Sequence, residues 1–107
     1  MEISKSDWKF YREKIGVWQE SYMEKLNNEY IHLLSATDKK ASDKFWALEK
    51  RIKNDRRYPG VIIEMRKSNA MYDMVSLVRL GVITCEDLTD FSEDLQQAVK
   101  YMVERFE

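Results

Sequence analysis

The longest periodic stretch of the chain covers residues 6–34 and reads SDWKFYREKIGVWQESYMEKLNNEYIHLL. Most of its large apolar side chains recur at intervals of three and four residues, which places them on one face of an α-helix. This first stripe consists of Trp8, Tyr11, Ile15, Trp18, Tyr22, Leu26, Tyr30 and Leu33. Ser4 or Ser6 can cap its start, because a short hydroxyl side chain accepts hydrogen bonds from the free N–H groups of the first turn. We therefore predict a helix over residues 6–34.

A second stripe with the same spacing consists of Ala41, Phe45, Leu48 and Ile52. It ends at Tyr58-Pro59-Gly60, where proline breaks a helix because its φ is fixed and it has no N–H. The stripe predicts a second helix over residues 38–56, separated from the first by the turn-like residues 35–38. Because the apolar period also runs through that turn, one continuous helix of about 50 residues remains an alternative.

Residues 61–80 are apolar around most of the helical circumference, and we find no strand-like alternation in the chain. The polar arc of this segment consists of Arg66, Asn69, Asp73 and Ser76. A helix that is apolar on nearly all sides packs against several neighbours. We therefore predict a central helix over residues 61–80.

The residues that follow have the pattern of a helix end and a new helix start. Gly81 lies where the C′ position favours a left-handed backbone, and Thr84 and Asp87 have the spacing of a capping box. They predict a fourth helix over residues 85–106 that forms an antiparallel hairpin with the third. Ser92 offers an alternative start that divides this fourth helix.

The composition is typical of a small helical domain. The chain has 107 residues, three glycines, one proline and one cysteine, with 44% hydrophobic residues and a formal net charge of −1. One cysteine excludes an internal disulfide framework, and no apolar run is long enough for a signal peptide or a membrane span. We expect a single all-α domain over residues 1–107, a bundle of about four helices, in the cytoplasm.

Residues that carry most enzyme chemistry are sparse. Glu29 and His32 have the E-x-x-H spacing of di-iron bundles, but such sites need the motif twice and the chain has one histidine. Cys85 lies beside Glu86 and Asp87, which oppose a thiolate, and we interpret it as an inert, partly buried residue. Three isolated glycines cannot form a phosphate-binding loop. We expect no enzyme, no metal site and no cofactor.

Several residues fall off the faces that the predicted helices should bury. Trp46 lies opposite the second stripe and shares its sector with Lys50, Lys53 and Arg57. An exposed indole among cations suits a protein-binding hot spot or a contact with nucleic acid. The alternative is that another helix or the lysine stems cover it.

The charges are unevenly distributed along the chain. Residues 39–57 contain eight basic and three acidic residues, whereas residues 84–97 contain five acidic residues and no basic one. The two surfaces of opposite sign either face different partners or face each other.

Two further groups are candidate contact residues. Phe10 and Val17 lie on the side of the first helix away from its main stripe, where a dimer seam or an additional helix can pack. Arg66, Asn69 and Asp73 occupy positions i, i+3 and i+7, a spacing that predicts a small polar network. The network either faces water as an exposed strip or fixes the register of a subunit interface.

These observations predict a protein that acts by protein–protein binding, either as a homodimer or as a regulatory or inhibitory module. The predicted contact residues are Trp46, Lys50, Lys53, Arg57, Phe10 and Val17. The alternative function is a nucleic-acid-associated regulator that uses the basic Lys50–Arg57 face of the second helix. Its affinity should then fall steeply as the salt concentration rises.

Overall fold

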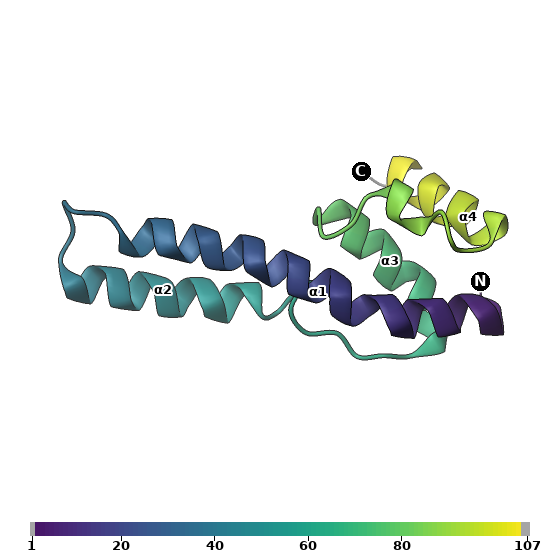
Figure 1. Ribbon diagram of the computed structural model, residues 1–107, viewed down its shortest axis with the longest axis horizontal. Helices are drawn as coiled ribbons and strands as arrows, with labels where there is room; N and C mark the ends of the chain where they lie inside the picture. Colours follow the sequence, from purple (N-terminus) through teal and green to yellow (C-terminus); the bar gives the residue numbers. More distant parts are fainter. Residues whose placement is uncertain (1, 106–107) are drawn as a thin grey trace.

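The computed structural model describes residues 2–105, which form four α-helices and two short 3-10 helices (Figure 1). The α-helices are α1 (Lys5–Leu34), α2 (Ala41–Asp55), α3 (Ala70–Arg79) and α4 (Glu93–Arg105), and the 3-10 helices are η1 (Lys67–Asn69) and η2 (Cys85–Leu88). Residues 2–105 contain no strand, so the all-α prediction is confirmed. None of the helices in this range is both long and apolar enough to cross a membrane.

The molecule has two regions that share α1 (Figure 1). We define the head as residues 2–19 and 61–105. In the head, the first half of α1 packs against the elements that follow residue 60. In the arm, residues 20–60, the second half of α1 pairs with α2 as an antiparallel hairpin. The molecule measures 52 × 25 × 19 Å. Its radius of gyration of 16.5 Å exceeds the value of about 13 Å expected for a compact chain of this length, because the arm projects from the head.

The predicted bounds of the first helix are confirmed to within one residue. The Ser4 Oγ atom accepts a 3.1 Å hydrogen bond from the Asp7 N–H and caps the helix. At the other end, the Lys44 ammonium donates to the carbonyl oxygens of Leu34 and Ala36 at 3.1 and 3.0 Å. These bonds fix a turn between α1 and α2, so the alternative of one continuous helix is wrong.

The prediction of a helix over residues 61–69 is wrong. Val61 ends the turn after α2, residues 62–66 are extended, η1 follows, and α3 begins only at Ala70. Val61, Ile63 and Met65 are partly buried whereas the residues between them are exposed, which is the alternation of an extended chain. β-Branched residues favour this conformation.

Gly81 ends α3 in the predicted way. Its φ is +76°, the left-handed conformation that glycine adopts without strain. The Gly81 N–H donates to the Val78 carbonyl at 3.1 Å and the Val82 N–H to the Leu77 carbonyl at 2.9 Å. This pair of bonds is a Schellman motif and reverses the chain toward η2.

The predicted capping box is also present, but the fourth helix is divided. The Thr84 N–H donates to the Asp87 carboxylate at 2.7 Å and starts η2. η2 ends at Leu88 and does not continue into α4. The Ser92 Oγ atom caps the start of α4 by accepting a 3.3 Å hydrogen bond from the Leu95 N–H. The alternative start at Ser92 is confirmed, and the continuous helix over residues 85–106 is wrong; residue 106 lies outside the described range.

The apolar core lies in the head, with α3 at its centre. Half of the ten residues of α3 are buried, which confirms the prediction of a central helix, and α3 packs along α4. The buried core residues of the head are Ile3, Tyr11, Ile15, Ala70, Met71, Met74, Val75, Leu77, Ile83, Leu88, Phe91, Leu95 and Val99. Asp7 is buried with them and accepts hydrogen bonds from the Ser92 N–H (2.9 Å) and hydroxyl (2.5 Å). This carboxylate therefore joins the first turn of α1 to the cap of α4.

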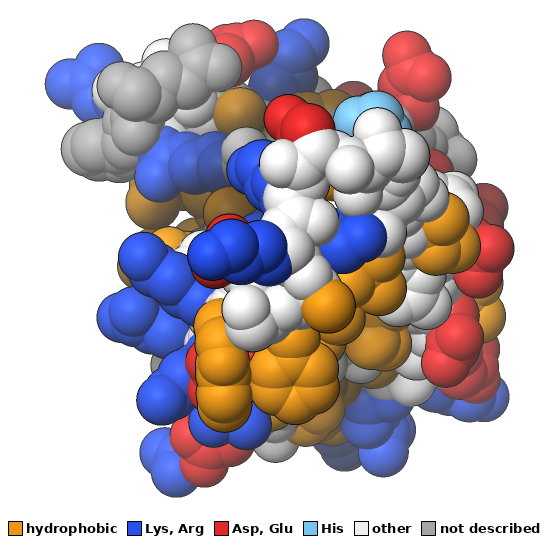
Figure 2. Space-filling view, turned by 90° about the vertical axis from the view of Figure 1, so that its left-hand side faces the viewer, with side chains coloured by type: hydrophobic (Ala, Val, Ile, Leu, Met, Phe, Trp, Pro, Cys, Tyr) orange, Lys and Arg blue, Asp and Glu red, His pale blue; other side chains and the backbone are white. Residues whose placement is uncertain are grey.

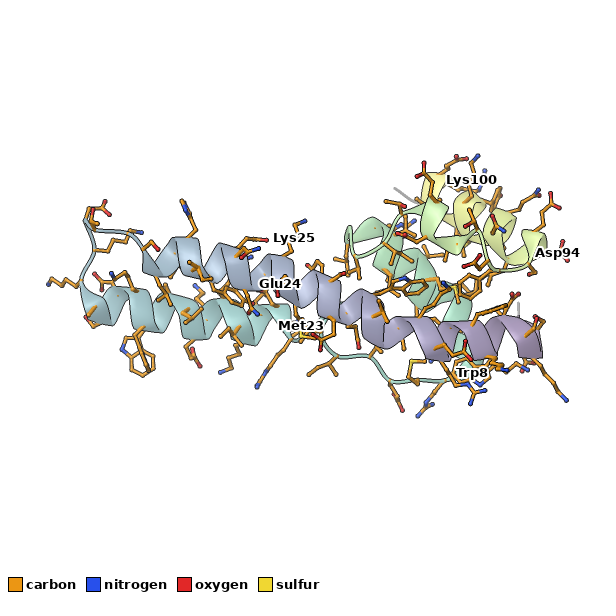
Figure 3. All side chains as sticks on the ribbon, in the orientation of Figure 1. Trp8, Met23, Glu24, Lys25, Asp94 and Lys100 are labelled. Carbon is orange, nitrogen blue, oxygen red and sulfur yellow. The ribbon has the colours of Figure 1, made fainter. Side chains whose placement is uncertain are left out.

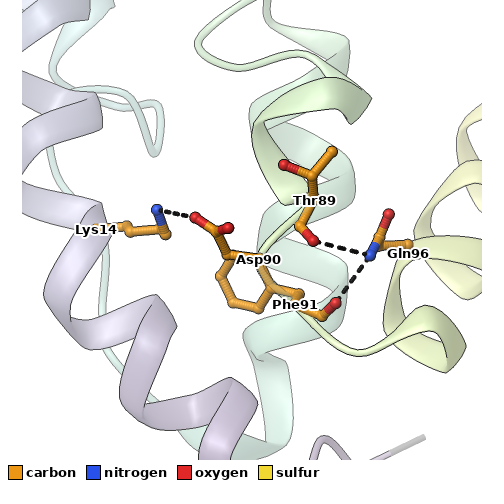
Figure 4. A network of polar contacts seen from close by, with 5 residues as sticks. All are labelled: Lys14, Thr89, Asp90, Phe91 and Gln96. Carbon is orange, nitrogen blue, oxygen red and sulfur yellow. Dashed lines mark hydrogen bonds and ion pairs between the residues drawn. The ribbon is translucent and has the colours of Figure 1, made fainter.

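Further polar contacts hold the link between η2 and α4 (Figure 4). The Lys14 ammonium pairs with the Asp90 carboxylate at 3.2 Å. The Gln96 side chain donates to the carbonyl oxygens of Thr89 (3.4 Å) and Phe91 (2.8 Å). These bonds place the link against α1, where the aromatic ring of Phe91 enters the core.

Candidate partner-binding surface of the arm

A polar cluster of four residues joins the two helices of the arm. The Arg51 guanidinium contacts Glu29 at 2.6 Å and Asp55 at 3.1 Å. The Tyr30 hydroxyl donates a 2.5 Å hydrogen bond to Asp55, and Arg51 also lies over the Tyr30 ring. Burial and this hydrogen bond raise the pKa of Tyr30 to about 12. The cluster fixes which face of α2 turns toward α1.

The remaining faces of α2 have no neighbour in the chain. No residue of α2 is buried, and on the side away from α1 its side chains project with no other element beyond them (Figure 3). Phe45 is 61% exposed and Ile52 is 43% exposed. The prediction that the second stripe forms a buried face is therefore wrong, because a two-helix hairpin covers only the seam between its helices.

The outer face consists of Trp46, Lys50 and Lys53 of α2 together with Arg57 of the turn that follows α2. Lys50, Lys53 and Arg57 line a shallow depression of about 280 Å³. Trp46 lies one turn earlier, is 63% exposed, and contacts the Phe45 ring edge-on at 4.9 Å between centroids. The alternative that a helix or lysine stems cover this indole is wrong.

A second surface, which we call the groove, runs along one side of the arm. It has a volume of about 420 Å³ and is lined by Phe45, Leu48, Glu49, Ile52, Lys53 and Arg56. Ile52 and Arg56 also line an adjoining hollow of about 250 Å³ that reaches Met23 and Tyr30 of α1. The groove therefore extends from α2 across to α1. Seen from the tip of the arm, uncovered hydrophobic side chains lie beside Lys and Arg side chains (Figure 2).

Phe10 and Val17 do not join these surfaces. Phe10 is in the head, where its ring packs edge-on against Phe91 at 6.0 Å between centroids. The same Phe91 ring also contacts Trp18, so Phe10 packs within the chain. The turn between η2 and α4 occupies this side of α1, which the sequence did not reveal. Val17 is 67% exposed.

The predicted network of Arg66, Asn69 and Asp73 is not formed. Arg66 belongs to the extended segment and pairs with Glu64 at 2.7 Å. Asn69 is exposed in η1, and the Asp73 Oδ2 atom is buried with no hydrogen-bond partner. Helical spacing cannot bring the three together, because the chain is not helical at residue 66.

The charged stretches lie at opposite ends of the molecule. The basic residues 39–57 are in the arm, whereas the acidic residues 84–97 are in η2, α4 and the link between them, which belong to the head (Figure 1). Part of the acidic charge serves local structure, because Asp87 caps η2 and Asp90 pairs with Lys14. The two stretches therefore do not face each other within one chain.

Of the residues considered for catalysis, Glu29 and His32 lie on α1 in the arm, whereas Cys85 lies in the head. Glu29 is bound to Arg51, and His32 is exposed beside it on α1. Cys85 is exposed at the start of η2, so the prediction that it is partly buried is wrong. Within residues 2–105, no three His, Cys, Asp or Glu side chains come close enough to hold a metal ion.

Sequence reasoning found the outer face but missed the groove. It assigned Phe45, Leu48 and Ile52 to the core, although the short link to α1 and the break at Pro59 leave α2 with one neighbour. No family model, curated protein sequence or solved structure matches the chain.

Proposed function

We propose that the protein acts by binding another protein, and that the outer face of α2 docks an acidic segment of that partner. The observation that supports this most is the exposure of Trp46, which is 63% accessible on a helix face with three cations. Tryptophan and arginine are enriched among residues that dominate binding energy. An exposed indole is otherwise unfavourable, because it leaves a large apolar area in water.

The sign of the charge selects the class of partner. Lys50, Lys53 and Arg57 have no ion-pair partner among residues 2–105, and no acidic residue lies between them on this face. A ligand with aspartate or glutamate residues beside an apolar anchor complements the face, because the anchor covers the indole while the carboxylates meet the cations. The same face of a second copy repels it.

The test uses peptides as defined probes. A display library of random peptides is panned on the full-length protein, and dissociation constants of the selected peptides are measured by fluorescence anisotropy. We expect selection of acidic peptides that contain an aromatic or aliphatic residue. Selection without acidic enrichment contradicts the proposal.

Matched variants locate the binding site. Trp46→Ala should weaken binding by at least about 30-fold, equivalent to about 2 kcal/mol. Tyr101→Ala is the control, because Tyr101 is also an exposed aromatic residue beside an arginine, but in α4 of the head. Equal affinities of the wild-type protein and Trp46→Ala contradict the proposal.

The nucleic-acid alternative is tested with the same variants. Labelled single-stranded and duplex DNA and RNA are titrated at about 50 mM salt, where phosphate contacts are strong. We expect no binding, because only three cations share the face and the net charge of the chain is −1. If DNA or RNA binds with an affinity that falls steeply as salt rises, and Lys50→Glu/Lys53→Glu abolishes this binding, the nucleic-acid function is correct and the proposed function is wrong.

A further inference from the structure

We infer that the groove of the arm is covered by a second copy of this chain, so that two arms form a four-helix bundle with two-fold symmetry. The groove adjoins the outer face and shares Lys53 with it, but its covering by a second copy does not depend on the proposed function. It rests on the pattern of the groove, on the area that the arm leaves exposed, and on the charges at the edge of the groove.

The apolar pattern is that of half a bundle. Phe45, Leu48 and Ile52 follow one another at intervals of three and four residues, the spacing of helices that pack side by side. Tyr30 and Met23 of α1 line the adjoining hollow, which shares Ile52 with the groove. In a four-helix bundle each helix buries such a stripe against two neighbours. In the single chain α2 has only one neighbour and buries no residue.

The exposed area agrees with a missing partner. The accessible surface is 7511 Å², whereas a compact monomer of 12.9 kDa is expected to expose about 6,300 Å². The excess of about 1,200 Å² is larger than the roughly 800 Å² that each partner buries in a standard protein interface. No residue of α2 is buried, so the arm contributes to this excess.

The edge of the groove carries both signs of charge. Glu49, Lys53 and Arg56 line it, and none of them has an ion-pair partner within residues 2–105. A two-fold axis presents the same surface to itself, so a mixed edge offers unlike charges to its copy. A surface of one sign cannot do this. The groove therefore fits a second copy, and the outer face, with only positive charge, fits a different partner.

The association of the full chain tests the inference. Light scattering coupled to size exclusion, over a concentration series, should give twice the 12.9 kDa mass of the chain. Phe45→Glu/Ile52→Glu should halve the measured mass, because it places four carboxylates in the apolar interface of the dimer. The control is Ile62→Glu, which alters an exposed apolar residue of the extended segment in the head and should leave the dimer intact.

Each other outcome overturns the inference. A wild-type protein that remains at 12.9 kDa at the highest concentration shows that the groove is open or belongs to a different protein. A dimer that persists in Phe45→Glu/Ile52→Glu shows that another surface associates. Circular dichroism confirms that the variant is still helical, since both altered side chains are largely exposed in the single chain. Trp46→Ala should remain dimeric, so failure of the proposed function and failure of this inference give different results.

Discussion

The head and the arm are both helical, but they are held together in different ways. In the head, α1, α3, α4 and the extended residues 62–66 surround one apolar core. In the arm, two helices meet along one seam, and Leu26 is the single buried hydrophobic residue among residues 20–60. A stripe of apolar residues is therefore not sufficient for burial. A stripe becomes part of a core only where enough other helices or segments of the chain pack against it. Otherwise it remains an exposed surface.

The largest expected effect is the loss of a core side chain in the head. Leu77 is fully buried on α3, whereas Leu34 at the end of α1 is 42% exposed. Leu77→Ala should lower the free energy of unfolding by about 2–5 kcal/mol, because it leaves a cavity in a packed core. Leu34→Ala should change it by less than about 1 kcal/mol. Urea denaturation followed by circular dichroism measures both, and equal losses would show that the arm is packed as tightly as the head.

The second effect concerns the junction between the two regions. Gly60 is buried, and an added Cβ atom would lie 2.5 Å from the Tyr22 ring of α1 and 2.9 Å from Val82. Gly60→Ala should therefore cost about 1–3 kcal/mol of stability through overpacking. Hydrogen exchange should also become faster in α2, since the displaced turn carries the end of that helix. Wild-type stability in this variant would show that the junction yields without strain.

The third prediction concerns Asp73, a partly buried carboxyl group in the head. Burial raises the pKa of the Asp73 carboxyl above its ordinary value, and its Oδ2 atom has no hydrogen-bond partner. The unfolded chain ionises first, near an ordinary pKa of about 3.9. The contribution of Asp73 to stability is therefore complete below that pH and is lost as the pH rises through the raised pKa.

Asp73→Asn isolates this contribution. We expect the melting temperature of the variant to rise relative to that of the wild type as the pH increases from about 4 toward neutrality. The other carboxylates titrate in both proteins, so their effect cancels in the difference between the two melting temperatures. A difference that stays constant with pH would show that Asp73 ionises equally in the folded and unfolded chains.

Local rules predicted more of this structure than global ones. The caps at Ser4, Gly81 and Thr84 follow from interactions within a few residues, and all three are confirmed. The apolar content of residues 61–66 favours a helix, but the alternate burial of Val61, Ile63 and Met65 is that of an extended chain. The contact between Phe10 and Phe91 joins residues far apart in the sequence, and no local spacing indicates it.

The candidate site divides in the same way. The outer face was predictable, since the helical period alone places Trp46 opposite the second stripe. The groove was not, because Phe45 and Ile52 have the sequence pattern of core residues. Their exposure depends on how many helices surround α2, and this is a property of the whole fold.

The smallest expected effect comes from Gly16, in the helix that the two regions share. An added Cβ atom at this position has no heavy atom within 4 Å, so Gly16→Ala adds helix propensity without a clash. We expect a gain of about 0.5–1 kcal/mol. Gly16 lies in the part of α1 that packs in the head, so the place where stability increases shows whether the arm unfolds independently. If it does, hydrogen exchange should slow in α3 and α4 while α2 is unchanged. Equal slowing in all helices would instead show that head and arm unfold as one cooperative unit.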